Sequence, residues 1–172
     1  INYANWGIAS PESALADIAS CDTVIAQVWT DTILTPCRSE GRVSVRPFAM
    51  AYLEFAQMVG MITPTGKSLA FLADPVSDNP MRQWSTYRRS YEHTIAAALC
   101  CGDVTRFEIM PWPDRVLARR YLQEVGNLEV ESRIPEGYAT SLLAVVNALR
   151  DMPKGEQKGM GIAVSDSLMY QR

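Results

Sequence analysis

The chain alternates short apolar runs with longer segments in which apolar residues recur every three or four positions. Three runs predict β-strands: 23–29 (TVIAQVW), 68–73 (SLAFLA) and 104–110 (VTRFEIM). The first two are almost continuously apolar, which is typical of strands buried on both faces of a parallel sheet. A short run at 161–165 (GIAVS) predicts a further strand, and 1–6 (INYANW) predicts the end of another.

Helical periodicity separates these strands. Ser10-Pro11-Glu12 predicts the start of a short helix ending near Ser20, with serine as N-cap and proline at the first helical position. Three longer helices are predicted at about 47–58, at about 81–99 and from 134 onward. Their expected buried stripes are, in order, Phe48, Tyr52, Phe55 and Val59; Trp84, Tyr87, Tyr91, Ile95 and Leu99; and Tyr138, Leu142, Val145, Val146 and Leu149.

The segments between these elements are predicted from their polar residues and helix signals. A polar loop is expected to about Arg46, and Gly60 is expected to end the second helix. Asp114 is expected to cap a helix to about Glu124, and 126–133 is expected to be a loop.

The order of strand, loop and helix predicts an α/β fold with a parallel sheet in one domain, residues 1–172. Right-handed crossovers place the carboxyl ends of all such strands on one side. That rim would gather four carboxylates and five aromatic or amide side chains, and no metal site is predicted there. The carboxylates are Asp31, Asp74, Glu108 and Asp166, and the other side chains are Asn2, Asn5, Trp6, Trp29 and Trp112.

Carboxylates interleaved with tryptophan suit glycoside chemistry. One acid protonates the leaving oxygen, a second acts as nucleophile or base, and indole rings stack on sugar rings. A carboxylate after a strand is also a common turn former, so each of these residues has a structural interpretation as well.

Charge, hydropathy and the absence of certain motifs argue against several other classes of protein function. The net charge of -3 and the sparse basic residues argue against a nucleic-acid partner, and the apolar runs are too short to span a membrane. No glycine-rich phosphate loop or serine-hydrolase elbow is present, and no cofactor is expected. The four cysteines and the single histidine, His93, lack the spacing of a metal site. The sequence does not decide whether Cys21 and Cys37 form a disulfide. The cellular location is not indicated.

The segment RFEIMPWPDR resembles the strand-end motif of (β/α)8-barrel glycoside hydrolases in the clan of β-galactosidases and β-xylosidases. Phe107, Glu108, Ile109 and Pro113 match that motif in type and order. With NYANWGIASPESALADI, FLADP, IPEGYAT and VSDSLMYQR, almost the whole chain looks like a group of uncharacterised bacterial proteins with such a barrel. The resemblance implies that these β/α units form part of a TIM-type barrel. It also implies hydrolysis of carbohydrate, with Glu108 as the leading catalytic residue.

Two questions follow from this resemblance. About five strands are predicted, whereas a closed barrel needs eight, so we expect a fragment of a longer chain or a covering chain, including a homo-oligomer. The alternative architecture is an open doubly wound sheet. Trp112 stands where the resembled family has its acid/base glutamate, so the alternative function is a carbohydrate-binding or structural module without catalysis.

Overall fold

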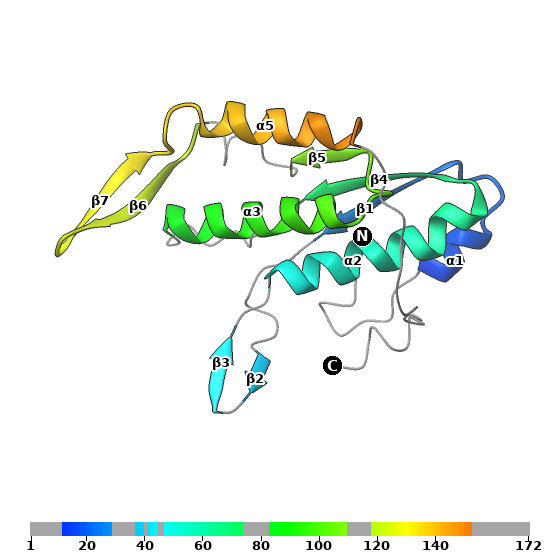
Figure 1. Cartoon of the computed structure of the whole chain (residues 1–172), viewed down its shortest axis with the longest axis horizontal. Helices are drawn as coiled ribbons and strands as arrows, with labels where there is room; N and C mark the ends of the chain where they lie inside the picture. The colour runs from blue at the N-terminus through cyan, green and yellow to red at the C-terminus, as the bar shows by residue number, and fades with distance from the viewer. Residues whose placement is uncertain are drawn as a thin grey trace.

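The computed structural model describes residues 12–28, 37–39, 41–44, 47–73, 83–109 and 118–152. These residues form four α-helices, one short 3-10 helix and seven strands (Figure 1). In chain order they are α1 (Glu12–Asp17), β1 (Thr23–Val28), β2 (Cys37–Ser39), β3 (Arg42–Ser44), α2 (Pro47–Ile62), η2 (Thr63–Thr65), β4 (Ser68–Ala73), α3 (Trp84–Cys100), β5 (Phe107–Ile109), β6 (Arg120–Val125), β7 (Leu128–Arg133) and α5 (Tyr138–Leu149).

A three-stranded parallel sheet, in the order β1-β4-β5, forms the centre of the described structure. The predicted parallel α/β fold is therefore confirmed for these strands. Parallel neighbours need a long crossover connection, and here α2 joins β1 to β4 and α3 joins β4 to β5. The predicted strands at 1–6 and 161–165 lie outside the described residues.

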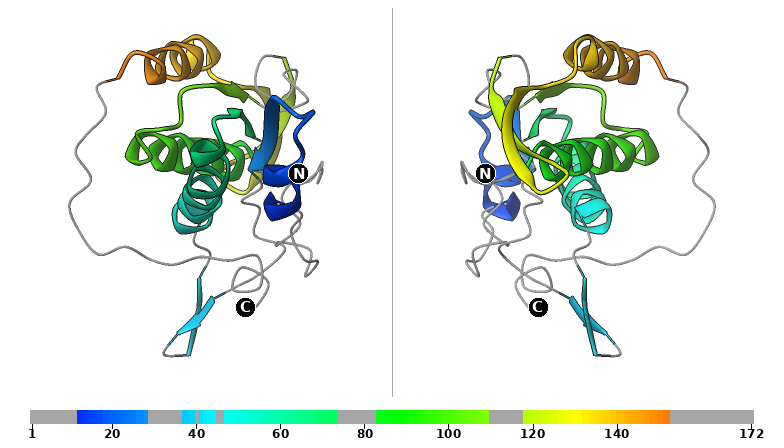
Figure 2. Two further views of the ribbon diagram at one scale, coloured as in Figure 1. Left: turned by 90° about the vertical axis from the view of Figure 1, so that its right-hand side faces the viewer. Right: turned by 90° about the vertical axis from the view of Figure 1, so that its left-hand side faces the viewer.

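One face of this sheet packs against helices. Val24, Ala26 and Val28 alternate along β1, and Phe71 lies beside Ala26 in the ladder, so all four side chains share that face. They form a core with apolar side chains of α2, α3 and α5, and Leu15 of α1 packs against it. Figure 2 shows α2 and α3 side by side on the same side of the sheet.

Helix α2 is rotated and extended relative to the prediction. Its buried side carries Ala51, Phe55, Met58 and Ile62, whereas Phe48 and Tyr52 are exposed. The helix packs on the sheet and also along α3, so the burial is wider than one stripe and includes Glu54 and Gln57. Gly60 does not end the helix, which continues to Ile62.

Helix α3 buries two faces. Trp84, Tyr87, Tyr91 and Ile95 are buried as predicted, and they pack against Tyr121 of β6 and Leu142 of α5 in a second, aromatic core. The rings of Trp84 and Tyr121 lie 5.4 Å apart, and those of Tyr87 and Tyr121 lie 4.7 Å apart.

The predicted burial of Leu99 is wrong, because its side chain is 38% exposed. Ala97 and Ala98 take the buried positions at this end of α3, where they belong to the core on the covered face of the sheet.

Two β-hairpins replace segments predicted as loops or helix. Residues 120–125 form β6 where a helix was predicted, and 128–133 form β7 where a loop was predicted. The missed signal is Gly126-Asn127 between Val125 and Leu128, a two-residue turn in which Gly126 adopts a φ of 65°. A second antiparallel pair, β2 and β3, lies within the predicted loop at 30–46.

The Lys67 side chain ties the start of β4 to the end of α1. Its Nζ donates to the backbone oxygens of Ile18 and Cys21, at 2.7 and 2.8 Å.

The cysteines Cys21, Cys100 and Cys101 are free thiols. The structure therefore does not contain the Cys21–Cys37 disulfide that the sequence left open.

We expect Phe55→Ala to lower the free energy of unfolding by about 3–5 kcal/mol, because it removes a fully buried ring. The Phe55 ring lies 4.8 Å from that of Phe71 and 5.8 Å from that of Phe107, so the helix loses an aromatic contact with each of two strands. Urea unfolding followed by circular dichroism measures the change. Tyr52→Ala, on an exposed side of the same helix, is the control and should cost less than about 1 kcal/mol. Equal losses for both variants would contradict this packing.

Candidate functional site

The carboxyl ends of the three parallel strands lie at one edge of the sheet. Val28 is paired with Ala73, and Ala73 with Ile109, so the last residues of β1, β4 and β5 stand in one row. The predicted gathering of strand ends is therefore confirmed for these strands. In parallel α/β folds this edge is where ligands bind.

The connections at this edge are much longer than those at the opposite edge. Residues 29–46 and 110–137 join β1 to α2 and β5 to α5, and each span contains a β-hairpin. At the opposite edge, 18–22, 63–67 and 101–106 lead from helices back to strands. Long connections on one side of a short-looped scaffold are typical of binding loops. The chain therefore concentrates its long connections at the carboxyl edge.

Glu108 is the predicted site residue that the structure describes. It is the middle residue of β5, next to the carboxyl edge, and its side chain is exposed. It lies in one row with Leu72 of β4 and Gln27 of β1, on the face of the sheet opposite to the helices. The other predicted residues lie outside the described part of the chain: Asn2, Asn5, Trp6, Trp29, Asp31, Asp74, Trp112 and Asp166.

The surroundings of Glu108 leave its carboxylate accessible. It is not in the packed core, and within the described residues no hydrogen bond or ion pair holds it, including none to Arg106. Gln27 is two strands away, roughly 10 Å at the spacing of a sheet. The described residues thus supply one accessible carboxylate and an amide on the same face, and they bring no second carboxylate to it.

Two other features are absent from the described residues. Among these residues no group of three or more histidine, cysteine or acidic side chains could hold a metal ion. None of the described helices is both long and apolar enough to cross a membrane. His93 is half-buried on α3 and its Nδ1 has no hydrogen-bond partner in the described structure.

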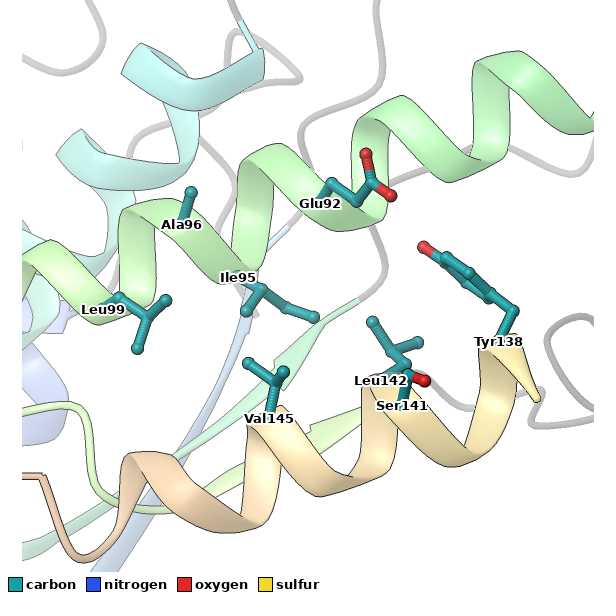
Figure 3. A pocket seen from close by; sticks show the side chains of 8 residues that line it. All are labelled: Glu92, Ile95, Ala96, Leu99, Tyr138, Ser141, Leu142 and Val145. Carbon is teal, nitrogen blue, oxygen red and sulfur yellow. The ribbon is translucent and has the colours of Figure 1, made fainter.

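An apolar groove of about 270 Å³ lies between α3 and α5, and the sequence did not predict it. Figure 3 shows Ile95 and Leu99 of α3 facing Leu142 and Val145 of α5, with Glu92 and Tyr138 at one end. The sequence feature that could have indicated this groove is helix α5, which has no charged residue. In the structure α5 exposes Leu143 and Val145. The groove lies away from the carboxyl edge and is not part of the Glu108 site.

Tyr138 closes one end of this groove with an unpaired hydroxyl. Its Oη is buried and has no hydrogen-bond partner among the described residues, and its ring meets that of Trp84 edge-on at 4.8 Å. Burial, and next the Glu92 carboxylate, raise the pKa of Tyr138 to about 12. Glu92 itself is held by Arg88, whose Nε lies 2.7 Å from its Oε1.

Tyr138→Phe should leave stability at neutral pH unchanged or raise it by up to about 1 kcal/mol, because the buried hydroxyl has no partner. Since the folded pKa is raised, the stability that neutral Tyr138 supports is complete below its ordinary value of 10 and is lost as pH rises towards about 12. The parent chain should therefore lose more stability than the variant across that window. Urea unfolding of both chains at neutral and alkaline pH measures the difference. A strongly destabilised variant at neutral pH would mean that the hydroxyl has a partner.

Comparison of the chain with models of protein families, with curated proteins and with solved structures finds no significant match. The fold and the site described above therefore rest on the residues of this chain alone.

Proposed function

We propose that this chain is part of a TIM-type (β/α)8 barrel of the glycoside hydrolase kind, which binds carbohydrate at the carboxyl edge of its sheet. Glu108 is the catalytic carboxylate in this proposal. The observation that carries it is an accessible carboxylate beside the carboxyl ends of parallel strands, on the face that the helices leave free. That face is the inside of a barrel.

The distribution of helices supports a barrel over a doubly wound sheet. Apolar side chains of α1, α2, α3 and α5 all belong to or pack against the core on one sheet face. A doubly wound sheet has helices on both faces, whereas a barrel has them all outside. On the other face Ile25 is 63% exposed. Further strands that close the barrel would cover Ile25 and its ladder neighbour Ala70.

Glycoside cleavage needs a second carboxyl group in addition to Glu108. The candidates from the sequence are Asp31, Asp74 and Asp166, each of which follows a predicted strand. A separation of about 5 Å between the two carboxyl groups gives retention, and about 6.5–9.5 Å gives inversion. In the same proposal four further side chains bind the sugar rings: Asn5, Trp6, Trp29 and Trp112.

The second candidate function is carbohydrate binding without cleavage. It is favoured by the row in which Glu108 lies, where the other polar side chain, two strands away, is the amide of Gln27 and not another carboxylate. An amide and a carboxylate can both hydrogen-bond sugar hydroxyls, and such a pair lacks a second acid.

Hydrolysis of a panel of chromogenic glycosides by the full chain tests the enzyme proposal. We expect Glu108→Gln to lower the hydrolysis rate at least about 100-fold, because the amide keeps the shape but cannot transfer a proton or attack. Asp17→Asn, the same chemical change at an exposed residue of α1, is the control and should retain the parent rate.

Affinity electrophoresis in polysaccharide gels separates the two functions. Retarded migration of the parent chain without hydrolysis would favour the binding module. Equal hydrolysis by Glu108→Gln and parent would remove Glu108 from the mechanism, and neither binding nor hydrolysis would overturn the proposal as a whole.

A further inference from the structure

We propose that the outer edge of β7 pairs antiparallel with β7 of a second copy of this chain, so that two hairpins form one four-stranded sheet. The hairpin of β6 and β7 extends beyond the amino-terminal end of α3 (Figure 1). An isolated two-stranded hairpin is only marginally stable, and more strands stabilise it. This inference is independent of the proposed carbohydrate site.

One face of the hairpin continues the aromatic core out into solvent. Tyr121 and Ser132 are paired at the base, where Tyr121 packs on Trp84 and Tyr87 of α3. Further out on the same face lie Val130, Val125 and Leu128, which are 43%, 61% and 71% exposed. The hairpin therefore carries an apolar face that α3 covers only at its base.

The backbone of β7 offers hydrogen-bonding groups along its outer edge. Val125 and Leu128 flank a two-residue turn, so they form a hydrogen-bonded pair, and such pairs alternate along the ladder. Val130 and Ser132 consequently bond to β6, whereas Glu129, Glu131 and Arg133 direct their N–H and C=O groups outward. The side chains of these three residues are exposed. An edge of this kind is a template for another strand.

The charges along β7 select the partner and its direction. Glu129 and Glu131 lie towards the turn, and Arg133 lies at the base, directly opposite Arg120 of β6. Like charges facing each other across a ladder are unfavourable, and within the described residues neither arginine is in an ion pair. An antiparallel second copy in which Glu131 pairs with Arg133 of the other chain sets opposite charges side by side at two symmetry-related places, whereas a parallel copy would set like charges together. The hairpin is thus complementary to itself under a two-fold axis.

Sedimentation velocity of the full chain over a range of concentrations tests the pairing. We expect a monomer–dimer equilibrium in the parent chain. Glu131→Pro should abolish the dimer, because it removes an outward N–H and leaves the hydrogen bonds between β6 and β7 in place. Glu131→Ala, which keeps that N–H, is the matched control and should still dimerise. Circular dichroism checks that each variant is folded.

A charge swap tests the direction of pairing. Arg133→Glu should weaken the dimer by roughly tenfold or more, because two symmetry-related contacts become repulsive. Glu131→Arg combined with Arg133→Glu should restore the dimer. If Glu131→Pro does not fold, the charge reversal and its compensated double variant together still decide whether β7 pairs with β7 of a second copy. A chain that stays monomeric at every concentration overturns the proposal, as does a dimer that none of these changes affects.

Discussion

The shared direction of β1, β4 and β5 is the constraint on which the rest of this structure depends. Parallel strands cannot be joined by tight turns, so each pair needs a crossover, and α2 and α3 supply them. Right-handed crossovers in a sheet whose strand order follows the chain order place both helices on one face. Phe55 fixes that arrangement, because its ring contacts Phe71 of β4 and Phe107 of β5 from the covering helix.

The same direction gives the sheet two edges with different connections. The edge where the strands begin has short connections and is tied by the Lys67 contacts to the end of α1. The edge where they end has the long connections, both hairpins and Glu108. The helices and short connections hold the sheet, while the long connections at the carboxyl edge lie outside the core.

The β6–β7 hairpin links this edge to the aromatic core. Tyr121 is anchored between Trp84 and Tyr87, so the base of the hairpin is fixed to the first turns of α3. Its outer half has no such support among the described residues and exposes apolar side chains on one face. The base of the hairpin is therefore anchored, whereas its outer half exposes apolar side chains and a free backbone edge.

The sequence by itself determined the parallel strands, because TVIAQV and SLAFLA are apolar on both faces and a helical period lies between them. It also placed Glu108 at a strand end. Tertiary structure decided the rest. Helix α2 turns Ala51 and Met58 inward because α3 packs beside it, a contact that periodicity along one helix does not contain. The charged residues of 120–133 favoured helix and loop, yet a two-residue turn and the anchoring of Tyr121 on α3 made a hairpin. The neighbours of Glu108 depend on the register between strands, which long-range packing sets.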